Sequence, residues 1–391
     1  MQELYEIITI LFLSFLLISS SLVIGKYSPS SIFLSVWLMI IAAFFLFRDS
    51  FIPVGDYTII CIVVSQFSIW LSSVIVHFIF EGNITKKNEG IIRIKGNELV
   101  AKFLLLFVVV SGVPYFKILG LTFSLDYFSS VRILLNSNDG ELFGLVGRYA
   151  QMIMVVCFFI CATEINNKIK VSFFIVALLF NIPLLSKENI VLFFLSYTYF
   201  MLLTGRLGFT SSVFKFILPL FALMFGIMYL RYGELFDIDF FNMMIKTYFL
   251  SSIPAFDILI QSSGVSLEPT VTLRSFYIFL NKFDLGYEIP PMLQSFVRTP
   301  YMTNIYTFLR PYYVDFGLLG IVVFSFSLGA ILTCVYESAI RGNNQLLLLL
   351  SVFSFPIVFS FFDEKFFTWT TQWFFIYILA HVITKRIKMV N

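Results

Sequence analysis

The sequence is poor in charged residues. Only 13% of its 391 residues are Asp, Glu, Lys or Arg, whereas 59% are hydrophobic and the mean hydropathy is +0.93. Soluble domains carry about 25% charged residues, so this composition excludes a water-soluble globular protein. A core of this size would leave too little polar surface to cover it. We therefore expect lipid to be the solvent for most of the chain.

Histidine, cysteine and nucleotide-binding motifs are also scarce or absent. The two histidines, His77 and His381, fall at the ends of apolar runs, where we expect interfacial or packed side chains. The four cysteines are scattered inside apolar runs, which favours neither a disulfide framework nor a metal site. The sequence contains no phosphate-binding Gly-rich loop and no dinucleotide fingerprint. We expect no cofactor, no metal, no nucleic-acid partner and no direct use of ATP.

Apolar runs long enough to cross a membrane recur along the whole chain. A spanning helix needs about 20 mostly apolar residues. About eleven ranges are candidates, and they lie approximately at 4–24, 31–47, 57–80, 102–119, 143–163, 170–186, 189–205, 213–230, 313–334, 346–362 and 366–383. The sequence therefore predicts an all-α integral membrane protein, with a tight hairpin between the sixth and seventh spans.

Basic residues in the short loops orient these spans. Cytoplasmic loops carry an excess of Lys and Arg. Basic residues gather at 81–101, at 164–170 and in the C-terminal tail, and all three segments fall on one side of the predicted topology. This side is predicted to be cytoplasmic, with the N-terminus outside. The predicted organisation is a set of spans in 1–230 with a short external loop near 120–142, a large periplasmic loop with surface helices at 231–312, and the last spans with a cytoplasmic tail in 313–391. Within the large loop, apolar periodicity at 240–262 and 293–312 predicts the helices that lie against the membrane surface.

The predicted external side is rich in arginine, carboxylates and tyrosine. Guanidinium groups bind phosphate oxygens through two parallel hydrogen bonds, and tyrosine rings offer flat faces that suit sugars. Arg148 falls inside a predicted span, where a charge usually faces a wet cavity or a partner. The candidate contacts to a ligand that carries both phosphate and glycan are Arg148, Lys187, Arg231, Arg274, Arg298, Arg310, Tyr306 and Tyr313. For any single arginine of the external loop, solvation of that loop is the alternative. For Arg148 the alternative is a structural ion pair, and for Lys187 it is capping of the turn together with Glu188.

The end of the large loop carries the most specific motif. Residues 304–317 read Asn-Ile-Tyr-Thr-Phe-Leu-Arg-Pro-Tyr-Tyr-Val-Asp-Phe-Gly. This passage resembles the Asn-x-Tyr/Phe-Thr…Pro-x-Tyr-x-Asp-Phe-Gly passage of bacterial Wzy-type O-antigen polymerases, and residues 248–257 resemble the start of their periplasmic loop. The Arg-x10-Gly spacing of some members is absent, because the intervals from Arg310 to Gly320 and from Arg274 to Gly286 are one residue too short and one too long.

The resemblance implies a fold, a reaction and a location. The fold would be a glycosyltransferase C-type membrane fold in the bacterial inner membrane, with the active site facing the periplasm. The enzyme would join oligosaccharide repeat units, linked to undecaprenyl pyrophosphate, into O-antigen or another surface polysaccharide. These lipid-linked oligosaccharides and membrane lipids would be its partners, and a chain-length-regulating membrane protein is a further candidate.

The reaction makes two chemical demands. Arginine donors would stabilise the negative charge on the departing pyrophosphate. A carboxylate, Asp315 or Asp257, would accept the proton of the attacking acceptor hydroxyl. For Asp315, capping of the helix that follows is the alternative.

Other functions remain open. An O-antigen ligase shares the layout and the lipid substrate, but we expect a histidine in its large external loop, and this sequence has none there. A lipid-linked oligosaccharide flippase or other transporter would place charges along a central path, whereas interior charges are few here. The missing external histidine also weakens a membrane acyltransferase.

Overall fold

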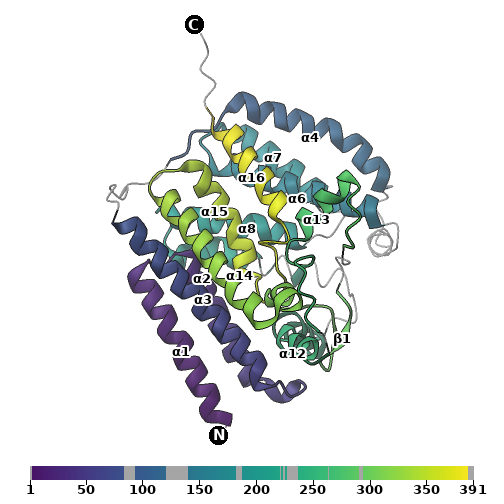
Figure 1. Ribbon diagram of the computed structural model, residues 1–391. Coiled ribbons are helices and arrows are strands. Elements are labelled where there is room, and N and C mark those ends of the chain that lie inside the picture. Colours follow the sequence, from purple (N-terminus) through teal and green to yellow (C-terminus); the bar gives the residue numbers. More distant parts are fainter. Residues whose placement is uncertain are drawn as a thin grey trace. The chain divides into compact units, whose positions relative to one another are not determined.

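The chain divides into two compact units. Both consist mainly of helices, which Figure 1 labels. The computed structural model describes residues 2–82, 93–119, 140–181, 187–220, 222, 225–226, 237–262, 264–289 and 294–385. Unit 1 comprises Met1–Lys86, Asp237–Arg341 and Pro356–Phe374, and unit 2 comprises Lys87–Phe236, Gly342–Phe355 and Phe375–Asn391.

Unit 1 contains the longest apolar helices. Its helices are α1 (Gln2–Val23), α2 (Pro29–Leu46), the 3-10 turn η1 (Arg48–Ser50), α3 (Asp56–Glu81), α11 (Ile238–Ile245), the π-helical η4 (Lys246–Leu250), α12 (Ser252–Ser262), α13 (Arg274–Leu280), the 3-10 turn η5 (Asn281–Phe283) and α14 (Leu309–Ile340). Among the described residues, four helices are long and apolar enough to cross a membrane: α1, α2, α3 and α14. The protein is therefore an all-α protein of membrane type, as its composition predicts.

Unit 2 contains further helices at the remaining predicted spans. They are α4 (Glu98–Leu119), α6 (Gly140–Ala162), α7 (Asn167–Asn181), α8 (Lys187–Leu203), α9 (Phe209–Ser212) and the π-helical η2 (Val213–Ile217). Helices α15 (Asn344–Val358) and α16 (Thr370–Thr384) each begin in one unit and end in the other. Residues 221, 223–224 and 227–230 of the predicted span 213–230 lie outside the described residues, as do residues 120–139 of the predicted loop near 120–142. The count of eleven crossings stays a prediction.

The predicted periplasmic loop 231–312 is only partly as expected. The region at 240–262, where the sequence predicts a surface helix, is helical. However, α11 with η4 and α12 are together also long and apolar enough for one membrane span, which would be bent by 51°. The expectation of a helix at 293–312 is wrong for its first part. There the antiparallel strands β1 (Val297–Arg298) and β2 (Met302–Thr303) pair, and helix begins only at Leu309.

Small residues bring α3 and α14 close together. A Cβ atom built on Gly329 of α14 would overlap the Ser72 hydroxyl and the backbone of Ile69 on α3. The Ser73 hydroxyl donates to the Gly329 carbonyl oxygen at 3.3 Å. Glycine and serine allow this close approach, which is typical of helix pairs in membranes.

A break near its start divides α14 into two parts. Gly317 has φ +59° and ψ −145°, which is outside the helical region and is readily adopted only by glycine. A Cβ atom at Gly320 would overlap the Tyr312 carbonyl oxygen, so this position also requires glycine. The span predicted at 313–334 therefore begins earlier than expected, with a separate first segment, Leu309–Phe316. This segment carries most of the motif.

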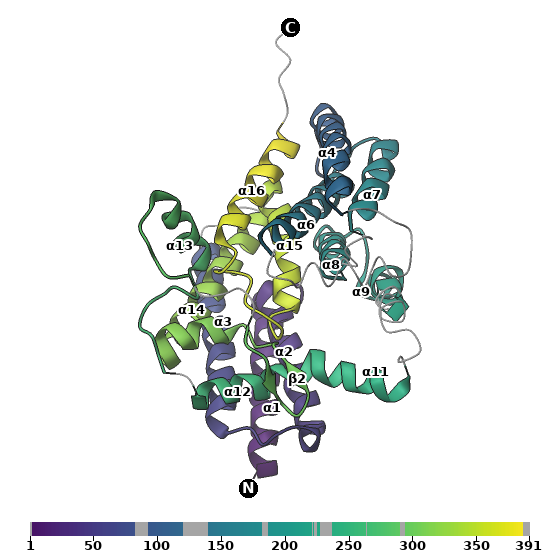
Figure 2. The same ribbon diagram turned by 90° about the vertical axis from the view of Figure 1, so that its right-hand side faces the viewer.

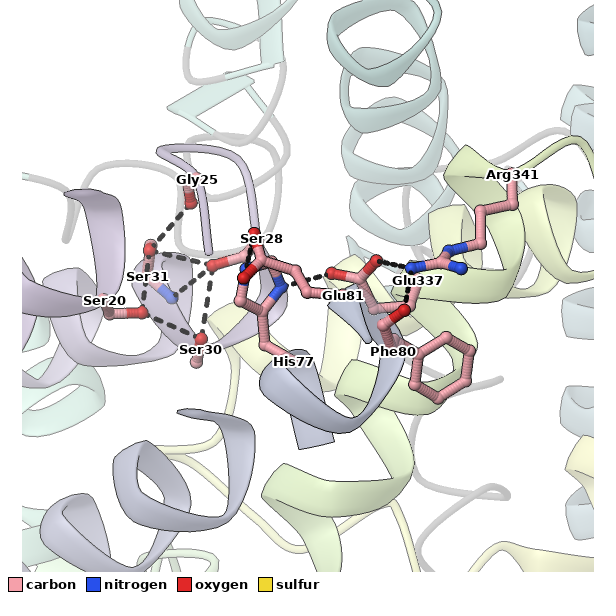
Figure 3. Close-up of polar contacts among 10 residues, drawn as sticks. All are labelled: Ser20, Gly25, Ser28, Ser30, Ser31, His77, Phe80, Glu81, Glu337 and Arg341. Atoms are coloured by element: carbon pink, nitrogen blue, oxygen red, sulfur yellow. Dashed lines mark hydrogen bonds and ion pairs between the residues drawn. The ribbon is translucent and has the colours of Figure 1, made fainter. Parts of the chain in front are cut away.

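A network of ionisable side chains joins α3 to α14 at the predicted cytoplasmic end (Figure 3). His77 Nδ1 lies 2.7 Å from Glu337 Oε1, and His77 Nε2 lies 3.3 Å from Glu81 Oε1. Arg341 Nη2 lies 3.6 Å from Glu337 Oε2 and donates to the Phe80 carbonyl oxygen at 2.8 Å. His77 is thus a packed residue, one of the two roles that the sequence leaves open for it.

Buried serines fix the turn between α1 and α2 (Figure 3). The Ser20 hydroxyl lies 2.9 Å from that of Ser30 and 3.0 Å from that of Ser31, and Ser31 donates to the Gly25 carbonyl oxygen at 3.0 Å. Ser28 accepts a bond from the Ser31 backbone N–H and so caps α2. The turn can therefore be buried without leaving these hydroxyls unpaired.

Candidate functional site

The first turns of α14 pack against the loop 359–369 within unit 1. The Phe308 N–H donates to the Ser360 carbonyl oxygen at 2.8 Å, and the Tyr312 hydroxyl donates to Glu364 Oε1 at 3.0 Å. The Trp37 indole on α2 donates to the Ser360 hydroxyl at 2.9 Å. These bonds fix the motif segment against a loop that lies about fifty residues further along the chain.

Glu364 organises this loop from inside. Its side chain is buried, and it accepts backbone N–H bonds from Phe366, Phe367 and Thr368 at 2.7, 2.9 and 2.8 Å. Burial raises the pKa of the Glu364 carboxyl above its ordinary value, and the bonds from the following residues act in the opposite direction. The carboxyl therefore holds the loop in one shape and fixes the directions in which its neighbours, Asp363 and Lys365, leave the backbone.

Two cationic side chains lie on the two segments that pack together. Arg310 stands in the first turn of α14, and its Nε is buried without a hydrogen-bond partner among the described residues. Its guanidinium carbon lies 5.5 Å from the Tyr306 ring centre, and it interacts electrostatically with Asp363 and Asp315. Lys365 is only 5% exposed, and its Nζ lies 4.8 Å from the Trp369 ring centre. A buried guanidinium donor without a partner is costly unless a ligand completes it.

The N-terminus of α14 lies beside Arg310. Phe308, the residue before the helix, makes no side-chain capping bond. The Thr307 hydroxyl is buried and has no hydrogen-bond partner within the described residues. Helix N-termini attract anions, because their first N–H groups point outward and the helix dipole is positive there. At this helix start most of the N–H groups are not free, because the Phe308 N–H donates to Ser360, the Arg310 N–H donates to the Thr307 carbonyl oxygen at 3.1 Å, and Pro311 has no N–H. The donors that the segment 307–310 offers to a phosphate group are therefore the Thr307 hydroxyl and the Arg310 guanidinium.

Asp315, a predicted base, anchors another segment. Its side chain is fully buried, with Oδ1 accepting the Val271 N–H at 3.3 Å and Oδ2 accepting the Thr272 N–H at 2.7 Å. Its carbonyl oxygen accepts the Leu267 N–H at 2.9 Å. The carboxylate holds the chain that leads into α13, so it does not cap α14. This geometry favours a positioning role.

Asp257, the other predicted base, caps α3 from a distant part of the sequence. It is 2% exposed, and its Oδ1 accepts the Gly55 N–H at 3.0 Å and the Thr58 hydroxyl at 2.6 Å. Its Oδ2 accepts a bond from the Gln261 amide at 2.6 Å. Gly55 directly precedes α3 and offers no side chain of its own for capping. The carboxylate therefore stabilises the positive end of α3.

The remaining candidates of unit 1 are two tyrosines that pack inside the protein and two arginines that are partly or fully exposed. Tyr306 is buried, and its hydroxyl donates to the Ser295 carbonyl oxygen at 3.0 Å. Tyr313 packs edge-on against Phe256, with ring centres 5.8 Å apart. Arg274 begins α13 and is half-exposed, whereas Arg298 is exposed and its Nε donates to the Pro300 carbonyl oxygen. Of the predicted binding residues, the structure brings Tyr306 and Arg310 together.

Unit 2 carries two of the predicted basic residues. Arg148 is exposed on α6, and Lys187 is half-exposed at the start of α8. Beside Lys187, the buried Asn189 amide donates to Asn181 Oδ1 at 2.7 Å, which ties the start of α8 to the end of α7. The sixth and seventh predicted spans are thus two separate helices, α7 and α8, and the residues between them, 182–186, lie outside the described residues. Arg231 lies outside the described residues.

Sequence reasoning missed the charged triplet Asp363, Glu364 and Lys365. The available signal was its position between two predicted spans, on the same predicted side as the motif. Charges in such a short loop are usually solvated, so the burial of Glu364 and Lys365 was not expected. Within the described ranges, no three His, Cys, Asp or Glu side chains form a group that could hold a metal ion.

No family model, no curated protein and no solved structure matches this chain. A functional assignment therefore rests on the residues of the chain and their geometry.

Proposed function

We propose that the protein is a membrane glycosyltransferase of the Wzy polymerase type. It joins oligosaccharide repeat units, carried on undecaprenyl pyrophosphate, into O-antigen or a related surface polysaccharide at the periplasmic face of the inner membrane. The proposal includes the eleven spans and the glycosyltransferase C-type fold that the resemblance implies. The main support is the Arg310 Nε, which is buried and has no hydrogen-bond partner in the described part of the chain, and which lies in the segment that resembles the polymerase motif.

The donors around the start of α14 would bind the pyrophosphate. Arg310 and Lys365 supply positive charge, and the Thr307 hydroxyl supplies a further donor. As the bond between the donor sugar and the pyrophosphate breaks, negative charge builds on the leaving oxygen, which preorganised donors stabilise. In comparable sites, removal of one such donor lowers the rate about 10²–10³-fold.

The acceptor hydroxyl must lose its proton to a base as it forms the new glycosidic bond. Asp315 and Asp257 both have their two carboxylate oxygens occupied by hydrogen bonds from the chain. Asp363 accepts the Glu364 N–H on its Oδ1 at 2.8 Å, but unlike Asp315 and Asp257 it is half-exposed, and it interacts electrostatically with Arg310. A substrate hydroxyl can therefore reach it, which makes it the better candidate for this base. In this proposal, Asp315 and Asp257 are positioning residues that hold the loops around the site.

Further support comes from polar contacts that agree with the predicted topology. Each of these contacts joins two segments that the sequence analysis places on the same side of the membrane: Glu6 with Arg48, Thr58 with Asp257, His77 with Glu337, and Arg93 with Glu164. The other basic candidates stay proposed contacts to substrate phosphate or glycan: Arg148, Lys187, Arg231, Arg274 and Arg298.

The test uses a host that makes the matching repeat unit but lacks this protein. We expect its glycan to stop at the core plus one repeat unit, whereas loss of a ligase or flippase would leave core alone. Wild-type protein should restore the ladder of long glycans, and Arg310→Ala should fail to restore it while it accumulates normally in the membrane. Arg310→Lys, which keeps the charge but loses the planar fork, should give partial recovery.

A matched control removes an arginine from the predicted cytoplasmic side. Arg93→Ala deletes a side chain that is 72% exposed and pairs with Glu164 at 3.7 Å. This variant should give a wild-type ladder, because an exposed ion pair contributes little. A normal ladder from Arg310→Ala would refute the proposed site.

A further inference from the structure

A group of apolar side chains is exposed on the segment that follows Val271 and Thr272, the two residues bonded to the Asp315 carboxylate. We define the α13 loop as residues 274–287, which comprise α13, η5 and the return to Tyr287. Its exposed apolar residues and their exposed fractions are Phe276 at 51%, Phe279 at 47%, Phe283 at 64% and Leu285 at 53%. Figure 2 shows this loop standing out beside α14. Clusters of exposed apolar residues on a folded protein usually mark a contact surface.

Internal bonds hold the α13 loop in one shape. The Asn281 amide donates to the Tyr287 carbonyl oxygen at 2.7 Å and accepts the Tyr287 N–H at 2.8 Å. The Asp284 N–H donates to the Asn281 carbonyl oxygen at 3.2 Å. The rings of Phe279 and Phe283 pack edge-on with centres 5.4 Å apart. The loop thus presents its apolar side chains from a closed backbone turn.

The loop is attached directly to the membrane-type helices of unit 1. Asp315 on α14 holds Val271 and Thr272, directly before the loop. The Ser275 hydroxyl donates to the Thr368 carbonyl oxygen, just before α16. On α14 itself, Leu319 is 69% exposed, as expected of a helix that faces lipid. The apolar side chains of the loop therefore belong to the same unit as an apolar, lipid-facing helix surface.

We infer that the α13 loop is a lipid-contacting element, with Phe279, Phe283 and Leu285 inserted at the boundary between headgroups and acyl chains. In that environment backbone polar groups need internal partners, and the bonds of Asn281 supply them at the turn. Lys282 and Asp284 flank Phe283, so the loop reaches only the headgroup level, where a lysine can extend to lipid phosphate. The occupant of this surface is the bilayer that the helices of unit 1 cross, whatever reaction the protein catalyses.

Fluorescence quenching of a tryptophan at the tip of the loop tests the inference. The variant Phe283→Trp is produced as the full chain and placed in phosphatidylcholine vesicles with or without brominated acyl chains. Emission from the four native tryptophans is subtracted with a wild-type sample. The matched control is Glu288→Trp, an exposed position one residue beyond the loop.

The expected result is that brominated lipid removes most of the added emission of Phe283→Trp, while iodide in the water has little effect. Glu288→Trp should show the reverse. If iodide quenches Phe283→Trp and brominated lipid does not, the loop lies in water and the inference is wrong. If neither quenches it, the loop is buried against protein, such as a second copy, and the inference is also wrong. Phe279→Trp repeats the test at a second position, in case Phe283→Trp does not fold.

Discussion

Asp257 and Asp315 could each act as a catalytic base or as an anchor that holds two segments together. The hydrogen bonds of Asp257 allow the sharper test between these two roles. If Asp257 anchors α12 to α3, the neutral and nearly isosteric Asp257→Asn should fold and function. Its amide oxygen can accept the bonds from Gly55 and Thr58, and its amide nitrogen can donate to the side-chain oxygen of Gln261 after a flip of that amide. If Asp257 is the catalytic base, the same change removes the proton acceptor and abolishes polymerisation.

The expected magnitudes follow from the number of bonds. Asp257→Ala removes the acceptor for all three donors in a buried site. A hydrogen bond to a charged group contributes about 1.5–3 kcal/mol, and these contributions are not additive, so we expect a loss of about 3–5 kcal/mol. Asp257→Asn keeps all three bonds but loses the charge at the helix end, which we expect to cost about 1 kcal/mol or less.

Two measurements on the same variants decide between the roles. Thermal unfolding in detergent measures stability, and the glycan ladder measures polymerisation. The anchoring role predicts a near-normal melting temperature and a normal ladder for Asp257→Asn, with a clear loss of stability for Asp257→Ala. A stable Asp257→Asn that makes no long glycan would refute the anchoring role. Normal stability of Asp257→Ala would show that the three bonds contribute little.

Two further changes address the segment around the break in α14. In the wild-type protein, each carboxylate oxygen of Asp315 accepts a backbone N–H group. In Asp315→Asn one of these N–H groups faces the amide N–H₂ instead and loses its acceptor, so we expect the free energy of unfolding to fall by about 1–3 kcal/mol, unlike in Asp257→Asn. An unchanged melting temperature would contradict this reading of the two bonds. Gly320→Ala places a Cβ atom against the Tyr312 carbonyl oxygen, and we expect a loss of about 1–3 kcal/mol from overpacking, measured by the same thermal unfolding. Gly147→Ala is the control and should not lose stability, because among the described residues its added Cβ meets no atom within 4 Å beyond its chain neighbours and the adjacent backbone of its own helix.

The positions of the long helices could be predicted from the sequence, because they follow from composition alone. The span predicted at 31–47 corresponds to α2 at Pro29–Leu46, and the span predicted at 57–80 corresponds to α3 at Asp56–Glu81. The break at Gly317 was not predictable, because a glycine within an apolar run is compatible with a continuous helix. Only the backbone angles of that residue distinguish the two cases.

The candidate site was predictable in residue type but not in contacts. The motif and the chemistry of phosphate binding pointed to Arg310, yet several other arginines satisfied the same argument. What distinguishes Arg310 is a buried Nε without a partner in the described chain, which depends on tertiary packing. The roles of Asp315 and Asp257 depend on partners more than forty and almost two hundred residues away, and no local pattern encodes such a contact. Lys365 was missed for the same reason.

The cap that Asp257 provides to α3 has a consequence for biosynthesis. Gly55 and Asp257 are separated by 202 positions in the chain. At about 5–20 residues per second, a ribosome needs roughly 10–40 s to cover that interval. During this time the N-terminus of α3 is already synthesised but its carboxylate partner is not. Chains that end before residue 257 would lack the carboxylate that accepts the Gly55 N–H and the Thr58 hydroxyl, so this helix end would have to find other acceptors.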